Sequence, residues 1–183
     1  TLIALPAVSG FLGGDFLGGL TLLYDMGFQR NFFFIDIGTN GEMCVCGKNG
    51  VTVATSCAMG PALEGMNISY GMTASDGAIT GVEPANGRLS LSVYGNGHPV
   101  GIAGTGLIAL IAEFVHAGAI SPDGRIQADE NSFPLGCRIG KSGSVETIFI
   151  SDPISVSQAD IRALQLAKAA SRSAAVLMLR ESG

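Results

Sequence analysis

A short stretch of the chain, Phe34–Glu42, combines residue types that could bind a phosphorylated ligand. Asp36 ends an apolar run and precedes a polar turn that two glycines flank. Glycine lets the backbone approach an anion closely, and successive N–H groups in such a turn can form an anion-binding concavity. We expect Asp36 to act at the catalytic centre by holding Mg²⁺ through water, since this ion keeps much of its hydration shell. The candidate phosphate-binding residues are Gly38, Thr39, Asn40 and Gly41.

The same stretch also fits a simpler interpretation. An ordinary hairpin turn needs the same glycines, and Asp36 would then only accept hydrogen bonds from the turn backbone. A buried strand before the turn and a returning strand after it favour the functional interpretation. The residue types alone leave both interpretations open.

A second glycine cluster, Gly101-Ile-Ala-Gly104-Thr105-Gly106, leads into an apolar, helix-like segment. A turn from a strand into a helix is a frequent nucleotide contact, because the helix N-terminus favours an anion. A dinucleotide-binding fingerprint is a rival interpretation, but the glycines are spaced by three and two residues where that fingerprint has two and three. A P-loop is not indicated, because no Gly-x4-Gly-Lys-Ser/Thr motif occurs.

The phosphate-binding candidate needs a sheet to hold it. The apolar run before Asp36 predicts a buried strand, and residues 32–57 predict a three-stranded antiparallel meander with two short turns. A glycine-spaced helix is expected before it, over residues 14–26, and a short helix after it, over residues 62–68.

Further strands are expected over residues 78–82, 88–93 and 145–150, with residues 83–87 as a turn and residues 121–147 rich in loops. An amphipathic helix should begin near Gly104 and end at Gly118. The Ser157-x-x-Asp160 pattern predicts the start of a final helix that reaches about Arg180. The fold class is therefore α/β or α+β.

Composition excludes several functions. The chain has 183 residues, a net charge of −5, and ten Lys and Arg residues that form no run. This distribution argues against nucleic acid or an anionic membrane as a partner. No stretch reaches 18 consecutive apolar residues, so no membrane span is expected. The opening residues lack the basic region of a signal peptide.

The four cysteines are expected to be buried or half-buried free thiols. A chain of this length does not need a disulfide scaffold, and no further ligands stand at metal-binding or iron–sulfur spacing. A reducing, cytoplasmic setting fits this interpretation. The two histidines, His98 and His116, are expected to have surface or capping roles because no second catalytic group accompanies them.

Several motifs together resemble a known family. In this order along the chain they look like the C-terminal part of reductive activators of corrinoid proteins, and the resemblance covers nearly the whole sequence. The motifs that carry it are Leu5–Phe11, Ile35–Glu42, Gly60–Ile68, Gly104–Ile108 and Asp160–Lys168.

The resemblance implies an ATPase fold of the acetate and sugar kinase, heat-shock cognate and actin superfamily (ASKHA). Chain 1–183 would then be a ribonuclease-H-like second subdomain, with a mixed sheet and a three-stranded antiparallel meander flanked by helices. The first subdomain, with the first phosphate motif, and an N-terminal [2Fe-2S] domain would lie outside this chain, which has no Cys-x4-Cys-x2-Cys run. Asp36–Glu42 would be the second phosphate motif and Gly104, Thr105 and Gly106 the adenosine motif. Glu64 and Asn67 would face the nucleotide from the connecting segment.

By the same resemblance, the parent protein would use ATP and Mg²⁺ to return the corrinoid cofactor of a methyltransferase system from Co(II) to Co(I). Electrons would come through its [2Fe-2S] cluster, and the partner would be the corrinoid protein. The fragment alone is expected to be inactive and to form a homodimer through surfaces left open. The alternatives are a sugar or acyl kinase of the same fold, or a catalytically inert binding or dimerisation module.

Overall fold

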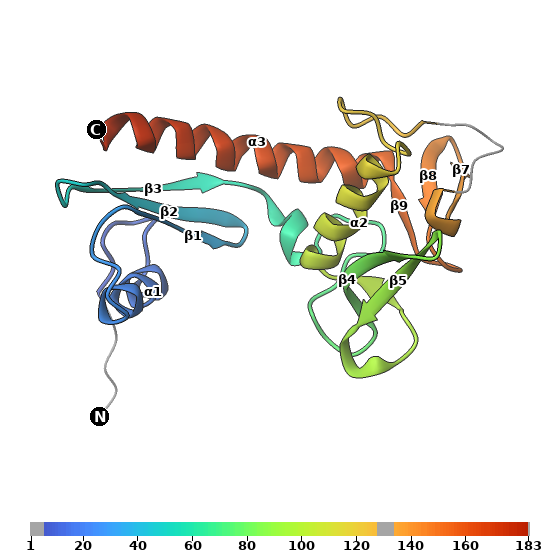
Figure 1. Ribbon diagram of the computed structural model, residues 1–183, viewed down its shortest axis with the longest axis horizontal. Coiled ribbons are helices and arrows are strands. Elements are labelled where there is room, and N and C mark those ends of the chain that lie inside the picture. The colour runs from blue at the N-terminus through green and yellow to red at the C-terminus, as the bar shows by residue number, and fades with distance from the viewer. Residues whose placement is uncertain (1–5, 128–133, 183) are drawn as a thin grey trace. The chain divides into compact units, whose positions relative to one another are not determined.

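The computed structural model describes residues 6–127 and 134–182 (Figure 1). The first residue of the opening motif, Leu5, lies outside the described residues. The chain divides into two compact units, Thr1–Met59 with Lys168–Gly183, and Gly60–Ala167. The two units are called unit 1 and unit 2 below.

Unit 1 contains the meander that the sequence predicts. Helix α1 (Gly14–Asp25) precedes strands β1 (Phe32–Ile37), β2 (Asn40–Cys46) and β3 (Thr52–Ala58). The strands are antiparallel in the order β1-β2-β3. The predicted helix over residues 14–26 and the predicted meander are confirmed.

One face of this sheet packs on α1. Phe32 and Phe34 of β1 lie against a cluster of Leu12, Phe16 and Cys44, and the rings of Phe16 and Phe34 are 5.4 Å apart. The opposite face of β1 carries side chains that are largely exposed, Phe33 at 44% and Ile37 at 51%. The prediction of a fully buried strand is therefore wrong, because β1 is an edge strand of its sheet and is covered by α1 on one face only.

Unit 2 begins with a mixed three-stranded sheet and a helix. Strands β4 (Ala78–Ala85) and β5 (Arg88–Val93) are antiparallel, and β4 pairs in parallel with β6 (Gly101–Ile102). Helix α2 (Gly104–His116) follows β6 and packs on β4. The predicted turn over residues 83–87 is too long. β4 continues to Ala85, and the turn consists of Asn86 and Gly87, which both have positive φ (51° and 74°) as in tight hairpins.

The rest of unit 2 has more strand than the sequence predicts. Strands β7 (Arg138–Ser142), β8 (Val145–Phe149) and β9 (Ser155–Ser157) form an antiparallel sheet in the order β7-β8-β9. Of these strands the sequence predicts only β8, with a loop in place of β7. β7 carries Gly140, Lys141 and Ser142, so its strand character comes from pairing with β8 rather than from β-favouring residue types.

The final helix, α3 (Gln158–Glu181), begins as predicted and runs from unit 2 into unit 1. Its start has the expected reciprocal cap, since the Ser157 N–H donates to Asp160 at 2.7 Å and the Asp160 N–H donates to Ser157 Oγ at 3.2 Å. Other helical segments are short. The 3₁₀ helix η1 (Pro61–Glu64) is shorter than the predicted helix over residues 62–68, because Gly65 adopts the left-handed conformation and ends it. Two more single 3₁₀ turns occur, η2 (Tyr94–Asn96) and η3 (Pro134–Gly136).

The core of unit 2 lies between its two sheets and its helices, and its largest fully buried side chains include Ile79, Leu110, Phe114, Ile148 and Ile161. Within the described residues, no helix has the length and apolarity needed to cross a membrane. The cysteines are free thiols, of which Cys44, Cys46 and Cys137 are buried and Cys57 is half-buried. This confirms the expectation from the sequence.

Candidate functional site

The predicted phosphate-binding residues form the β1–β2 hairpin of unit 1. Ile37 pairs with Gly41, and the turn between them is closed by a hydrogen bond from the Gly38 N–H to the Asn40 carbonyl, at 2.9 Å. The Thr39 carbonyl accepts from the Met59 N–H at 3.1 Å, which fixes the turn to the end of β3. Thr39 and Asn40 are both exposed at the turn. The hairpin therefore presents its polar residues on a backbone that is held on both sides.

The two acidic residues of this hairpin lie directly opposite each other. Asp36 of β1 pairs with Glu42 of β2, and Glu42 pairs with Ser56 of β3. Directly opposed residues share one face of an antiparallel sheet, so the three side chains form a row. Ser56 Oγ lies 3.5 Å from Glu42 Oε1. Asp36 is exposed, whereas Glu42 and Ser56 are half-buried.

This row carries two carboxylates. Like charges directly opposite each other destabilise a sheet. Within residues 6–127 and 134–182, neither Asp36 nor Glu42 forms an ion pair with a lysine or arginine. A hard cation would relieve this repulsion, since carboxylate and hydroxyl oxygens are the ligands it prefers.

Gly41 packs closely against sulfur atoms of its own unit. A β-carbon at this position would collide with the sulfur of Met59 and would stand 3.3 Å from that of Cys57. A larger residue at position 41 would therefore displace the Met59 side chain.

The predicted adenosine-binding residues lie in unit 2, at the start of α2. Ala103 precedes the helix in an extended conformation, and no side chain caps the helix. The N–H groups of the first turn have no partner within the helix. Thr105 is exposed, whereas Gly104 and Gly106 are buried.

Both glycines of this turn are fixed by backbone packing. A β-carbon on Gly104 would overlap the carbonyl oxygen of Leu63, and one on Gly106 would overlap that of Ile79. The start of α2 is therefore pressed against η1 and β4. Of the three residues of this turn, Thr105 is the exposed one.

The connecting segment lies against the same turn. Leu63 belongs to η1, which also carries the half-buried Glu64. Asn67 is exposed and has a positive φ of 60°. The structure thus brings η1, with Glu64, to the start of α2, while Asp36, Gly38, Thr39, Asn40, Gly41 and Glu42 form their own group in unit 1.

One residue of the row was missed from the sequence. Ser56 was not singled out, although the predicted meander places a residue of the third strand opposite Glu42. The strand pairing that would identify it depends on the length of the second turn. That turn length cannot be read from the residue types, so neither can the register.

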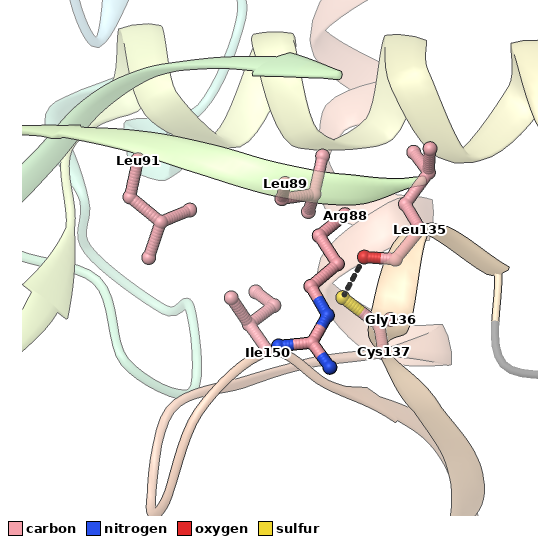
Figure 2. Close-up of a pocket in the computed structure, with 7 residues that line it drawn as sticks. All are labelled: Arg88, Leu89, Leu91, Leu135, Gly136, Cys137 and Ile150. Atoms are coloured by element: carbon pink, nitrogen blue, oxygen red, sulfur yellow. Dashed lines mark hydrogen bonds between the residues drawn. The ribbon is translucent and has the colours of Figure 1, made fainter. Parts of the chain in front are cut away.

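A cavity of about 310 Å³ lies elsewhere in unit 2 (Figure 2). Figure 2 shows the Arg88 guanidinium extending toward Ile150. The Cys137 thiol lies 3.9 Å from the carbonyl oxygen of Leu135. Burial raises the pKa of this thiol to about 11, so it is neutral at physiological pH. None of the predicted site residues lines this cavity, whose walls are Arg88, Leu89, Leu91, Leu135, Gly136, Cys137 and Ile150.

Comparisons with known proteins agree in the family they indicate. The family model for the C-terminal domain of RACo, the ASKHA domain, matches residues 30–183. The corrinoid activation enzyme RamQ of Eubacterium limosum is 35% identical over 184 residues, which cover 93% of this chain and 30% of that protein. The reductase of the Co(II) methylated amine-specific corrinoid protein of Methanosarcina barkeri is 33% identical, over 68% of this chain and 28% of that protein.

A solved structure is similar over nearly the whole chain. The reductive activator for a corrinoid, iron-sulfur protein superposes with a TM-score of 0.84 at 32% identity, over 97% of this chain and 29% of the other. The chain therefore spans about 30% of the length of the relatives it matches.

Proposed function

Because the chain belongs to the family of reductive activators of corrinoid proteins, as their C-terminal ASKHA domain, we propose that it is the ATP-binding part of such an activator. The parent protein would use ATP to return a corrinoid cofactor from Co(II) to Co(I), with the corrinoid protein of a methyltransferase system as its partner in the cytoplasm. The observation that carries the ATP-binding assignment is the pair of opposed carboxylates, Asp36 and Glu42, beside an exposed polar turn.

The residues present fit a magnesium ion. The carboxylates of Asp36 and Glu42 share a face and repel each other, and no basic group of the described residues pairs with them. Asp36 would hold the ion through water, with Glu42 as its neighbour in the row. When bound, Mg²⁺ neutralises phosphate charge and so favours attack on the terminal phosphorus.

The protein's own groups would orient the phosphates. Thr39 and Asn40 present side-chain donors at a turn whose backbone is held by Gly38 and Met59. A preformed donor array lowers the cost of ordering the site when the ligand arrives. The hairpin would thus act as one wall of the phosphate site.

The second proposed contact is at the start of α2. The unpaired N–H groups of its first turn and the Thr105 hydroxyl would face the adenosine side of the nucleotide. Glu64, on the packed η1 segment, and the exposed Asn67 would contribute from the connection. Closure of the parent protein around ATP and reopening after hydrolysis would supply the conformational work. Electrons would come from the [2Fe-2S] domain of the parent protein.

The test is Asp36→Ala in the full-length protein. We expect Mg²⁺-dependent ATP hydrolysis, and ATP-dependent reduction of the corrinoid protein, to fall by at least about a hundredfold, the scale of losing a group that positions the charge-neutralising ion. The melting temperature should not fall, because Asp36 is exposed and has a like charge opposite. The matched control is Asp25→Ala, an exposed carboxylate at the end of α1 in the same unit.

ATP hydrolysis at the wild-type rate in Asp36→Ala would show that Asp36 is not part of the ATP site. A wild-type protein that hydrolyses ATP but leaves Co(II) unreduced would point instead to a kinase-like or other phosphotransferase role for the fold.

A further inference from the structure

A buried carboxylate in unit 2 has more partners than a helix cap requires. Asp160 is 2% exposed and accepts four hydrogen bonds. One oxygen accepts from the Ser157 N–H and hydroxyl, at 2.7 and 2.8 Å. The other accepts from the Ser69 N–H and hydroxyl, at 2.9 and 3.2 Å. The first pair caps α3, whereas the second reaches a segment far away in the sequence.

The Ser69 segment runs beside β6. The Ile102 N–H donates to the Tyr70 carbonyl at 2.7 Å, and the Met72 N–H donates to the Ile102 carbonyl at 3.0 Å. This pattern is parallel strand pairing, with a bridge between Gly71 and Ile102. β6 therefore has β4 on one side and residues 70–72 on the other.

β6 leads directly into the start of α2. Only Ala103 separates Ile102 from Gly104, and its N–H donates to the Ile79 carbonyl at 2.9 Å. Close packing leaves this assembly little freedom. A β-carbon on Gly71 would overlap the Gly65 carbonyl, just as one on Gly104 would overlap the Leu63 carbonyl. A shift of Ser69 would therefore displace both β6 and the segment that carries Glu64 and Asn67.

We propose that Asp160 is a positioning residue for the nucleotide, which acts by holding Ser69 and, through residues 70–72 and β6, the N-terminal turn of α2. The proposal rests on the proposed function, since it assigns the α2 turn to the nucleotide. Asp160 does not touch the ligand. Its carboxylate holds two segments in place, because Ser157, at the start of α3, and Ser69, in the segment beside β6, bind its two oxygens.

The experiment compares Ser69→Ala and Asp160→Asn with wild type in the full-length protein. Ser69→Ala removes one hydroxyl from the cluster and leaves the α3 cap intact. Ser69→Thr restores the hydroxyl and should behave as wild type. Ser90→Ala, at an exposed serine of β5 in the same unit, is the matched control. We call the contact of Asp160 with Ser69 and Ser157 the clamp. These variants separate a specific effect at the clamp from general loss of stability.

Two measurements are made on each variant. Hydrogen exchange reports the Met72 and Ile102 amides, which should exchange about tenfold faster in Ser69→Ala and faster again in Asp160→Asn, a change of the size of one hydrogen bond to a charged group. Calorimetry with Mg-ADP, and KM and kcat for Mg-ATP, report the site. The dissociation constant and KM should rise about tenfold with kcat little changed, because the loss is in binding that the ground state and the transition state share.

Unchanged exchange at Met72 and Ile102 in Asp160→Asn would overturn the clamp. Faster exchange with wild-type nucleotide affinity would also overturn the proposal, because it would reduce Asp160 to a stability role. A wild-type protein that binds no Mg-ADP would refute the proposed function itself, and that result is independent of the variants. Recovery of both affinity and protection in Ser69→Thr would support the proposal.

Discussion

At the scale of single residues, two of the buried cysteines lie in different units and share one property, a raised pKa. Cys44 lies in the α1-facing core of unit 1 and Cys137 in the wall of the unit 2 cavity. Burial raises the pKa of each to about 11 from an ordinary value of 9.0. A neutral, buried thiol packs like a small apolar side chain. Their role is thus to fill space in the core.

The raised pKa values predict how stability depends on pH. Between pH 9 and pH 11 the unfolded chain loses protons from Cys44 and Cys137 while the folded chain keeps them. The unfolded state then binds fewer protons, so the free energy of unfolding falls as pH rises through this range and is unaffected below pH 9. Denaturant titrations of wild type and Cys137→Ala at pH 8, 9, 10 and 11 should show a shallower fall for the variant. Parallel curves would contradict the burial of this thiol.

At the scale of elements, the local patterns of the sequence predict most of the fold. The meander, α1, α2 and the capped start of α3 follow from apolar periodicity, glycine turns and the Ser157–Asp160 pattern. β9 could not be predicted because it has only three residues, and β7 could not because it gains its strand character only from pairing with β8. The exposed face of β1 was missed for a related reason, since a run of four apolar residues does not show which neighbour covers each face.

The candidate site was predictable to a smaller extent. The hairpin residues from Asp36 to Glu42 were identified from their types and spacing, and the structure places them on one hairpin. Ser56 and the partnership of Ser69 with Asp160 were not, because each depends on contacts between segments distant in the sequence. The glycines before α2 stand out in the sequence, but their packing against the Leu63 and Ile79 carbonyls could not be inferred from a motif.

That packing predicts whether replacing Gly104 with alanine stabilises or destabilises the protein. Helix propensity favours alanine over glycine by up to about 1 kcal/mol, whereas a β-carbon on Gly104 would overlap the Leu63 carbonyl. Since backbone cannot move aside as a flexible side chain can, we expect Gly104→Ala to destabilise the protein by about 1–3 kcal/mol. Gly97→Ala is the control, because a β-carbon there has open space and φ is −89°. Chemical denaturation measures both, and a stabilised Gly104→Ala would contradict the packing.

At the scale of the whole molecule, the chain is about 30% of the length of its relatives. The parent ATPase is expected to hold ATP between two subdomains, each supplying donors. By the proposed function, this chain would supply the donors of one of these subdomains. The opposing phosphate loop is expected in the part of the relatives that this chain does not match.

We therefore predict that the 183-residue chain alone binds Mg-ATP weakly and does not hydrolyse it. Losing two or three charge-assisted hydrogen bonds, at about 1.5–3 kcal/mol each, would reduce affinity by roughly two to five orders of magnitude relative to the full-length protein. Isothermal calorimetry on the isolated chain measures this, with the full-length protein as reference. Micromolar binding would show that the isolated chain binds Mg-ATP without the rest of the protein and would contradict the prediction.

The bond between Ser69 and Asp160 also bears on the order of folding. These residues are 91 positions apart, and closing a long loop costs entropy before any contact is gained. The β1–β2 and β4–β5 hairpins join neighbouring segments and need no such closure. The clamp should therefore form after the folding transition state, so Ser69→Ala should speed unfolding and leave the refolding rate unchanged. Stopped-flow kinetics would detect the opposite, a slowed refolding limb, if the clamp belonged to the folding nucleus. A bond formed late on folding is also broken early on unfolding. The contact of Ser69 with Asp160, and with it the packing of residues 70–72 on β6, would therefore open before the rest of unit 2 unfolds.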